Sequence, residues 1–424
     1  MKTLTVALIG AGQRGKDVYG EYMEKHPEKI RLVAVAEPDA AKREEVIRRH
    51  HIDPKYAFPT WEEMLALPKF CDCVIIATSD DGHFEPAMTA LEKGYHLLLE
   101  KPMSNRLDES LKIARLAEKL NRKVVVSHVL RYTPFFSTIK KLLEEKKIGD
   151  VITVQHNENI GFFHFAHSYV RGNWRNSSTS SPLVLAKCCH DLDILVWLLG
   201  KKAEKIAAFG NLKYFREENR PEKAADYCVY CPLKETCPYS ATTIYSQFLG
   251  SWPATVVTRA KTKEELFKVL ETSDYGRCVF RCDNDVVDHM SIIIEFEDGI
   301  TATFNISAFT HEITRTIKIM GTKGEIRGHM EKNEIELYEF GQKAPVVYRP
   351  ELVEGGGHMG GDYKLMDNFV EIMRGEKDEI LTSAQISVQS HIMAFAAEKS
   401  RLENKIVDIE TFRMETEQQM KISS

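Results

Sequence analysis

Three glycines near the N-terminus constrain the fold of this chain more than any other feature. The segment Gly10-Ala11-Gly12-Gln13-Arg14-Gly15 follows an apolar run, Val6–Ile9, and precedes a helical pattern. In that setting Gly10 permits a tight turn, Gly12 lets the backbone approach a pyrophosphate, and Gly15 allows close helix–strand packing. The pattern therefore predicts a dinucleotide-binding loop, with the pyrophosphate at the helix N-terminus.

Strands and helices alternate regularly through residues 1–127. The expected strands are Thr5–Ile9, Arg31–Ala36, Cys73–Ala77, His96–Leu99 and Lys123–Ser127. The expected helices are Asp17–Lys25, Ala40–Arg49, Trp61–Leu65, Glu85–Lys93 and Leu107–Leu120. The strands lack polar alternation, which is typical of strands covered on both faces. We therefore predict an α/β fold whose N-terminal domain, residues 1–127, is a Rossmann doubly wound parallel sheet that binds NAD(P).

An acidic residue indicates which dinucleotide is bound. Glu37 ends the second expected strand, 22 residues after Gly15, and a carboxylate there bonds a ribose hydroxyl and disfavours a 2′-phosphate. The sequence therefore favours NAD, while Lys42 and Arg43 keep NADP open because either could reach a 2′-phosphate. The cofactor-binding candidates are Gly10, Gly12, Gln13, Arg14, Gly15, Glu37, Thr78, His83, Glu100 and Lys101. In the Thr78–His83 loop, His83 is either a cofactor contact or the first residue of a helix.

A lysine follows the fourth expected strand. Glu100-Lys101-Pro102 comes directly after His96–Leu99, at the carboxyl edge of the sheet, where such sheets hold their ligands. There Lys101 can handle the proton that a hydroxyl loses when its carbon gives up a hydride. The segment predicts a redox enzyme, and a surface lysine with no chemical role is the plainer alternative.

The pattern changes after about residue 127. Further strands are expected at Val151–His156, Met290–Phe296, Thr301–Ser307 and Thr316–Met320. Further helices are expected near Thr138–Lys146, Leu183–Leu199, Asp362–Arg374 and Ala384–Leu402, the last two closing the chain. Segregated strands and helices predict an α+β domain over residues 128–424 with a mostly antiparallel sheet, for substrate binding and oligomerisation.

A cysteine cluster lies in an expected insertion at about 205–280. Cys228, Cys231 and Cys237 have C-x2-C-x5-C spacing, and C-x2-C is a metal-knuckle pattern. Structural zinc usually needs four ligands, and no fourth ligand follows at motif spacing. We favour buried or free thiols over a structural zinc, and we assign no metal site.

Composition excludes several classes of protein. The net charge of −5 and the lack of a long basic run argue against nucleic-acid binding. No apolar run approaches the ~18 residues that cross a bilayer, and the start of the chain lacks a signal-peptide layout. The nine cysteines do not follow an extracellular disulfide pattern. We therefore expect a cytoplasmic protein with no nucleic-acid or membrane partner.

The ordered set of motifs resembles the glucose–fructose oxidoreductase, inositol dehydrogenase and rhizopine-catabolism (GFO/IDH/MocA) family over nearly the whole chain. The resembling segments are Gly10–Gly15, Thr78–His83, Glu100–Pro102, Arg131–Pro134, His190 with Asp193 ahead of Trp197–Gly200, and Gly357–Asp362. The resemblance implies a Rossmann domain joined to an α/β domain with a large open sheet, often used to form a homodimer or homotetramer. It also implies NAD(P)-dependent oxidation or reduction of sugars, inositols or related polyols.

The family resemblance assigns the proton chemistry to Lys101 and His190. Many members place an aspartate four residues before this histidine, where the present chain has Ala186. Lys187 and Asp191 are four apart, so they form either a helix ion pair or a substituted polar site in which Lys187 binds substrate. In the second interpretation Asp191 or Asp193 orients His190, and Asp193 is the better placed.

Substrate contacts are expected from the aromatic and polar segment Gly161–Ser181 and from nearby motifs. Aromatic rings stack on sugar faces, while arginine and histidine bond hydroxyls or a carboxylate. The candidates are Arg131, Tyr169, Trp174, Arg175, Lys187 and Asp193. An interface or packing loop is the alternative for this segment.

The sequence thus predicts an NAD(P)-dependent oxidoreductase that transfers a hydride between a nicotinamide cofactor and a small polyhydroxy compound. Two other functions stay open. One is a non-catalytic protein that senses NAD or sugar, which Ala186 favours. The other is a glycoside hydrolase that uses bound NAD transiently.

Overall fold

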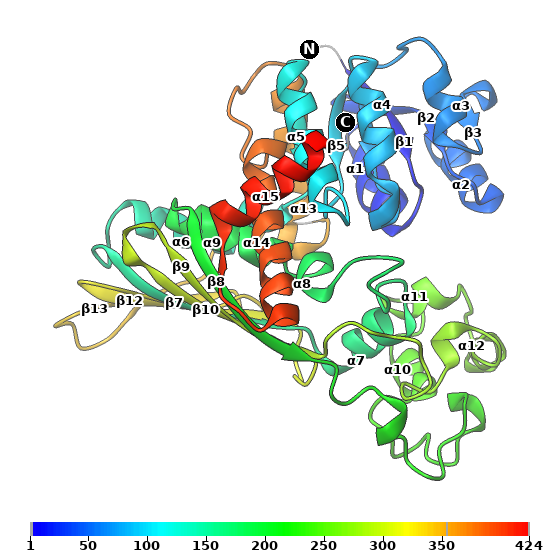
Figure 1. The fold of residues 1–424 in the computed structure, drawn as a ribbon. Helices are drawn as coiled ribbons and strands as arrows, with labels where there is room; N and C mark the ends of the chain where they lie inside the picture. Colours follow the sequence, from blue (N-terminus) through cyan, green and yellow to red (C-terminus); the bar gives the residue numbers. More distant parts are fainter. Residues whose placement is uncertain (1–2, 353–354, 423–424) are drawn as a thin grey trace.

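The computed structural model describes residues 3–352 and 355–422, and it contains two sheets (Figure 1). The first has six strands in the order β3-β2-β1-β4-β5-β6, all parallel. Its strands are β1 Leu4–Ile9, β2 Ile30–Ala36, β3 Ala57–Phe58, β4 Cys73–Ile76, β5 His96–Leu99 and β6 Val124–Val126. The strand order reverses between β1 and β4, and ligands of such sheets bind at the carboxyl ends beside that reversal.

Helices cover both faces of this sheet, as expected for strands that are apolar throughout. They are η1 Gln13–Gly20, α1 Glu21–Lys25, α2 Ala40–His50, α3 Trp61–Ala66, α4 Phe84–Glu92 and α5 Leu107–Lys119. The predicted doubly wound domain is confirmed. One detail differs, because the first helix starts as a π-helical segment, η1, directly after Gly12.

The second sheet has nine strands in the order β14-β13-β12-β11-β7-β10-β9-β8-β15. They are β7 Val151–Asn159, β8 Ala203–Asn211, β9 His289–Phe296, β10 Thr301–Ser307, β11 Thr314–Gly321, β12 Gly324–His329, β13 Glu334–Glu339, β14 Val346–Tyr348 and β15 Val407–Asp408. β7 and β10 run parallel, and the other neighbours run antiparallel. The predicted α+β architecture, with a mostly antiparallel sheet, is therefore confirmed.

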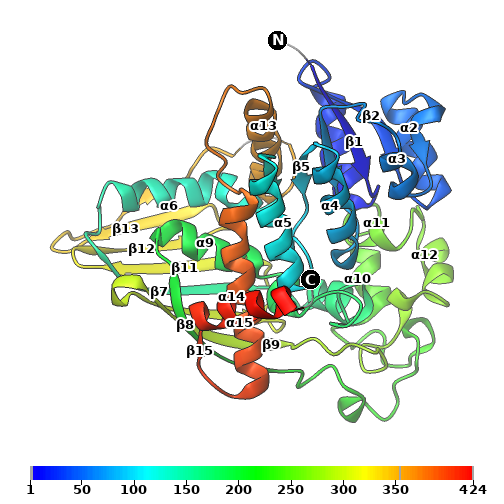
Figure 2. The ribbon, with the colours of Figure 1, turned by 45° about the horizontal axis from the view of Figure 1, so that its top comes forward.

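The main helices after the first sheet are η4 Val129–Tyr132, α6 Pro134–Glu144, α7 Phe162–Phe165, η5 Ala166–Arg171, α8 Leu183–Ala186, α9 Cys189–Leu199, α10 Ala241–Gln247, α11 Ala254–Val257, α12 Lys263–Leu270, α13 Gly361–Met373, α14 Ala384–Glu403 and α15 Ile409–Ile422. The short helices are η6 Glu217–Asn219, η7 Cys228–Tyr230, η8 Asp274–Gly276, η9 Glu297–Gly299 and η10 His358–Gly360. Helix α14 packs between α5 and β8, so it joins the two sheets (Figure 2). Residues of α13 share a buried cluster with β1 and β2, which anchors this late segment on the first domain.

Two expectations about helices are wrong. The single helix expected over Leu183–Leu199 is two helices, α8 and α9, interrupted at Lys187 and Cys188. A third closing helix, α15, follows the two that were expected. It was missed because it is mostly polar and buries only Ile409 fully, so its apolar stripe is faint.

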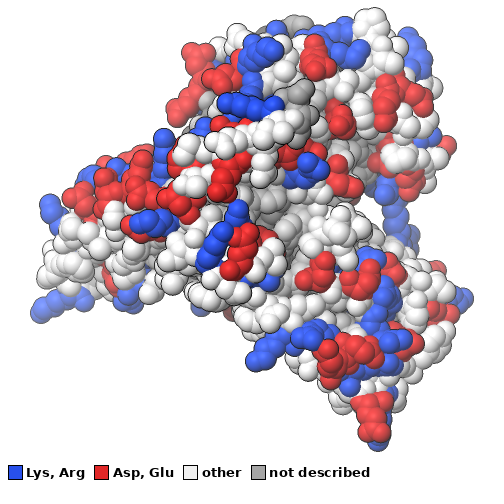
Figure 3. Space-filling view, in the orientation of Figure 1, with Lys and Arg blue, Asp and Glu red and all other residues white. Residues whose placement is uncertain are grey.

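The segment between β8 and β9 forms a small unit with its own buried cluster, built from α10, α12 and the Cys228 turn. Its loop before α12 reaches the first domain, where Arg259 lies 2.5 Å from Glu45 of α2. Figure 3 shows basic side chains crossing the gap between these two parts, while acidic and basic groups intermingle elsewhere on that face. The insertion therefore spans toward the Rossmann domain from the far end of the second sheet.

A buried ion pair fixes α9 against the end of the first sheet. Arg131 of η4 donates to both carboxylate oxygens of Asp193, at 2.6 and 2.7 Å. The two side chains are only 4% and 1% exposed. A third Arg131 nitrogen donates to the Leu381 carbonyl at 2.9 Å. The pair thus holds the segment that carries His190 in place.

Replacing Asp193 with asparagine leaves Arg131 buried without its counter-charge. We expect Asp193→Asn to lower the free energy of unfolding by about 3 to 5 kcal/mol, measured by urea titration. The control is Asp150→Asn, which breaks an exposed pair with Lys146 and is expected to cost no more than about 1 kcal/mol. Equal stability of the two variants would contradict a stabilising role for the buried pair.

Candidate active site

The glycine loop has the shape that a dinucleotide needs. Gly10 has φ +88°, and a Cβ there would lie 2.6 Å from the Ala77 carbonyl oxygen. A Cβ on Gly15 would lie 2.1 Å from the Gly10 carbonyl oxygen, whereas one on Gly12 would meet nothing within 4 Å. Gly10 and Gly15 therefore serve the turn and the packing, and Gly12 borders open space. The loop fits a pyrophosphate against Gly12 at the start of η1.

The end of β2 fits the adenosine side of the cofactor. Glu37 is buried, and its carboxylate accepts hydrogen bonds from the backbone N–H of Ala11, at 2.6 Å, and of Asp39, at 3.0 Å. Its acid group therefore lies beside the glycine loop, where a ribose would be bound. The guanidinium of Arg43 donates to the Glu37 and Pro38 carbonyls, at 2.5 and 3.3 Å.

Arg14 is tied into a buried charge network. Its Nε lies 2.5 Å from a Glu100 oxygen, Nη1 lies 2.8 Å from Asp362, and Nη2 donates to the Tyr19 hydroxyl at 2.9 Å. Because the guanidinium has three protein partners, a cofactor contact from Arg14 would come from its backbone. The neighbouring Gln13 is exposed at the loop.

Glu100 is the centre of this network. One carboxylate oxygen accepts from Arg14 and Tyr19, and the other from the Ser127 hydroxyl at 2.7 Å and the Lys101 N–H at 3.1 Å. Burial alone would raise the pKa of Glu100, but Arg14 and the bonds from Tyr19 and Ser127 outweigh it and lower the pKa to about 2. The carboxylate is therefore ionised at neutral pH and holds the Lys101 backbone.

Lys101 extends from this turn toward the second domain. Its Nζ donates to the Ala186 carbonyl oxygen at 2.6 Å, and Ala186 is the last residue of α8. The interruption after α8 therefore directs a main-chain acceptor at the lysine. Position 186 contributes through its backbone, a contact that a sequence comparison of side chains cannot reveal.

His190 is the second residue of the next helix, α9, and is 5% exposed. Its ring lies 5.6 Å from that of His128 and 5.9 Å from that of His358, between centroids. Burial lowers the pKa of His190 well below its usual range, and the charge of Lys101 lowers it further. The imidazole is therefore neutral at pH 7, and its buried Nδ1 has no hydrogen-bond partner among the described residues. Lys101 lies within electrostatic reach of the ring.

The acidic residues near His190 have other partners. Asp191 is bonded to His156 at 2.8 Å and to Arg315 at 2.7 Å. Asp193 is bonded to Arg131, so in this structure the orienting bond to His190 predicted for these aspartates is replaced by bonds to other side chains. The Lys187 ammonium lies 3.4 Å from Glu158 rather than in a helix pair with Asp191.

The aromatic segment meets the first domain at Asp80, just beyond β4. Trp174 donates from its indole N–H to Asp80 at 3.2 Å, and the Ser181 hydroxyl donates to the same carboxylate at 2.7 Å. The Tyr169 ring lies 6.2 Å from that of Trp174. Arg175 instead faces the insertion, where its Nε donates to Asp283 at 2.9 Å.

The Thr78–His83 loop supports the lysine turn. His83 is buried and donates from Nδ1 to the Pro102 carbonyl oxygen at 2.7 Å, with Nε2 3.3 Å from the Thr78 carbonyl. Thr78 in turn donates from its hydroxyl to the Gly82 carbonyl. His83 thus precedes α4 directly, and its ring faces the lysine turn.

The cysteine cluster gives no support for zinc. All nine cysteines are free thiols, and Cys228 accepts a bond from Arg171 at 3.5 Å. Among residues 3–352 and 355–422, no group of three or more His, Cys, Asp or Glu side chains has an arrangement that could hold a metal ion. Within the same ranges, no helix has both the length and the apolar character to cross a membrane.

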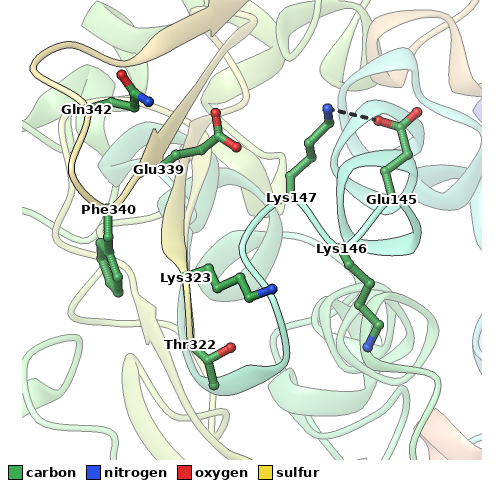
Figure 4. A pocket seen from close by; sticks show the side chains of 8 residues that line it. All are labelled: Glu145, Lys146, Lys147, Thr322, Lys323, Glu339, Phe340 and Gln342. Atoms are coloured by element: carbon green, nitrogen blue, oxygen red, sulfur yellow. Dashed lines mark ion pairs between the residues drawn. The ribbon is translucent and has the colours of Figure 1, made fainter.

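A hollow of about 610 Å³ lies far from these residues, between the end of α6 and the β11–β13 strands (Figure 4). Its lining residues are Glu145, Lys146, Lys147, Thr322, Lys323, Glu339, Phe340 and Gln342. None of the residues that surround Lys101 lines it, and its wall is mostly charged surface side chains. The candidate active site is therefore at the edge of the first sheet, where Lys101 and His190 lie, rather than in this hollow.

Comparison with known proteins matches both halves of the chain to one family. A model described as "Oxidoreductase family, NAD-binding Rossmann fold" matches residues 4–128, and one described as "Oxidoreductase family, C-terminal alpha/beta domain" matches residues 140–409. The Bacillus subtilis (strain 168) protein YteT is 26% identical over 85% of this chain and 87% of its own length. Inositol 2-dehydrogenase of Corynebacterium glutamicum (strain R) is 27% identical over 48% of this chain and 57% of that protein.

Solved structures share the whole fold at low sequence identity. An oxidoreductase domain protein from Kribbella flavida superposes with a TM-score of 0.72 at 18% identity, covering 96% of this chain and 100% of that one. The WlbA dehydrogenase from Bordetella pertussis, solved with NADH and UDP-GlcNAcA, gives a TM-score of 0.68 at 17% identity, covering 96% and 99%. These likenesses establish the two-sheet architecture.

The glycine loop offers a matched pair of substitutions. Gly12→Ala adds a methyl group in open space, so we expect stability near wild type but weaker NADH binding, by 10-fold or more (~1.4 kcal/mol), in a fluorescence titration. Gly15→Ala drives its methyl group into the Gly10 carbonyl and is expected to lower stability by about 1 to 3 kcal/mol. Wild-type NADH affinity in Gly12→Ala would contradict the assigned pyrophosphate site.

Proposed function

Because the chain belongs to the GFO/IDH/MocA oxidoreductase family, we propose that it is an NAD-dependent dehydrogenase acting on the CH–OH group of a sugar, inositol or related polyol. The observation that carries this proposal is the position of Lys101. The Lys101 side chain extends from the carboxyl edge of the Rossmann sheet, and its ammonium donates a hydrogen bond to the Ala186 carbonyl oxygen. The neutral ring of His190 is close enough for its pKa to respond to the charge of Lys101. A cation and a proton acceptor are thus held together where the nicotinamide end of the cofactor is expected.

The proposal takes NAD in preference to NADP. Support comes from Glu37, whose buried carboxylate lies beside the glycine loop and would repel a 2′-phosphate. Lys42 and Arg43 are the cations that could balance such a phosphate, but the Arg43 guanidinium already donates to two backbone carbonyls and the Lys42 ammonium lies 4.0 Å from the Asp39 carboxylate. When bound, NAD supplies the acceptor for the hydride.

The chain's own residues then manage the proton. The Lys101 Nζ donates a hydrogen bond to the substrate oxygen, which favours the negative charge that develops there as the C–H bond breaks. The imidazole of His190 would take up the hydroxyl proton as the substrate oxygen becomes a carbonyl oxygen. In the reverse direction the same imidazolium returns the proton.

Side chains of the second domain supply the substrate contacts in this proposal. Trp174, which is 37% exposed, offers ring surface near Asp80, and the buried Tyr169 ring lies behind it. Lys187 is a partly exposed cation paired with Glu158. Arg131 and Asp193 bond each other, so we assign them the placement of α9 rather than direct contact with substrate. The inositol 2-dehydrogenase relative supports a polyol as the substrate class.

We also propose a homo-oligomer that buries the outer face of the nine-stranded sheet. Helices α6, α9 and α14 lie on one face of this sheet, while the other face is bare among the described residues (Figure 1). Phe209 and Ile293 on the bare side are 68% and 56% exposed, which is unusual for such large apolar side chains.

The compartment proposed for this protein is the cytoplasm. The nine free thiols support it, because they are consistent with a reducing compartment.

Lys101→Met tests the proposed chemistry. The substitution keeps the length of the side chain but removes the ammonium, so we expect kcat to fall by about 10²- to 10⁴-fold with NADH affinity near wild type. The assay follows the absorbance of reduced nicotinamide during a screen of sugars, inositols and related polyols. Lys119→Met, on the exposed side of α5, is the matched control and is expected to leave both quantities unchanged.

Two results would overturn this function. Tight NADH binding without turnover on any member of the screen would indicate a sensing protein. Unchanged kcat in Lys101→Met on an active substrate would remove Lys101 from the proton chemistry.

A further inference from the structure

Two buried histidines form hydrogen bonds to the turn that follows Lys101. His83 donates to the Pro102 carbonyl oxygen at 2.7 Å from one side. On the other side the Met103 N–H donates to Nε2 of His391 at 2.8 Å. His391 lies in α14, 288 residues further along the chain, and it is fully buried. The carbonyl and the N–H of the Pro102–Met103 peptide unit, one residue beyond Lys101, therefore both bond to imidazole rings.

The hydrogen bonds of His391 define which of its nitrogens carries the hydrogen. A backbone N–H can only donate, so Nε2 is the bare acceptor. Nδ1 then carries the hydrogen and donates to the Ser387 carbonyl oxygen at 2.9 Å. Burial lowers the pKa of His391 to about 3, and His128 adds to that shift, so the ring stays neutral at pH 7. A neutral ring with this tautomer is the form that the Met103 N–H requires.

Further polar groups surround His391, from its own helix and from the segment that follows β6. The Ser390 hydroxyl lies 3.4 Å from His391 Nδ1 and 3.4 Å from His128 Nε2, and it donates to Ser387 at 2.8 Å. The His128 ring lies 5.7 Å from that of His391 and 5.6 Å from that of His190. The His128 ring thus connects His391 to His190, which belongs to the proposed catalytic pair.

We propose that His391 is a positioning residue for Lys101. By holding the Met103 N–H it fixes the backbone of the lysine turn, and with it the approach of Nζ to the Ala186 carbonyl. Its effect on turnover rests on the proposed function, whereas its effect on the lysine turn does not. An apolar residue of similar size would fill the space but would leave the Met103 N–H buried without an acceptor, at a cost comparable to that of a lost hydrogen bond.

Two substitutions separate this role from simple packing. His391→Leu removes the acceptor, while His391→Gln offers an amide oxygen for Met103 and an amide N–H for Ser387. Ser400→Ala is the control on the same helix, because Ser400 accepts a buried bond from the Ala208 N–H far from the lysine turn. The first readouts need no substrate: hydrogen exchange of the peptide containing Met103, and the rate at which acetic anhydride acylates Lys101, both by mass spectrometry.

We expect His391→Leu to speed both exchange at Met103 and acylation of Lys101 severalfold, with His391→Gln close to wild type and Ser400→Ala unchanged at these positions. If His391→Leu matches Ser400→Ala in both readouts, the positioning role is wrong. If the variants show the expected labelling but the wild-type protein turns over no substrate, the proposed function is wrong and the positioning role of His391 stands.

Activity provides the second arm on whichever polyol the screen identifies. We expect kcat of His391→Leu to fall by up to about 10²-fold, as for a catalytic group displaced by ~1 Å, with the KM for NAD unchanged. His391→Gln should recover most of that loss. A KM effect in place of the kcat effect, or no rescue by glutamine, would contradict the proposal.

Discussion

The site depends on the hydrogen bonds that the buried carboxylate of Glu100 receives. An ionised acid in the interior is stable only when its oxygens are well bonded, and Glu100 receives bonds from Arg14, Tyr19, Ser127 and the Lys101 N–H. Those partners come from the glycine loop, from η1, from the residue after β6 and from the lysine turn. Through Arg14 the network also reaches Asp362 at the start of α13. One charge thus ties the glycine loop, the Lys101 turn and the C-terminal segment together.

The polar residues of α9 differ in their roles: two aspartates hold the helix in place, and His190 is the proposed proton acceptor. Asp191 and Asp193 are taken by Arg315 and Arg131, which hold the helix in place. His190 keeps a neutral ring beside Lys101 because burial and that cation both oppose its protonation. The alanine at position 186 is then no gap in the site, because its main-chain oxygen receives the lysine ammonium.

Local patterns were enough to predict the two-domain architecture, the glycine loop and the lysine at the sheet edge. Apolar runs and turn residues act over a few positions, so they are legible in sequence. The Lys101–Ala186 contact, the Arg131–Asp193 pair and the grip of His391 join residues 62 to 288 positions apart. Periodicity carries no information about such pairs. It also predicted one continuous helix where the structure has two, α8 and α9. The polar helix α15 escaped for a related reason, since its buried stripe is slight.

The central claim is that the nicotinamide binds where Lys101 and His190 converge. A crystal structure of the full chain with NAD⁺ tests it most directly. The account predicts the pyrophosphate against Gly12, the adenosine ribose against Glu37, and the reactive ring carbon of the nicotinamide facing the Lys101 ammonium and the His190 imidazole. A dinucleotide bound outside the glycine loop, or a nicotinamide turned away from both side chains, would contradict it.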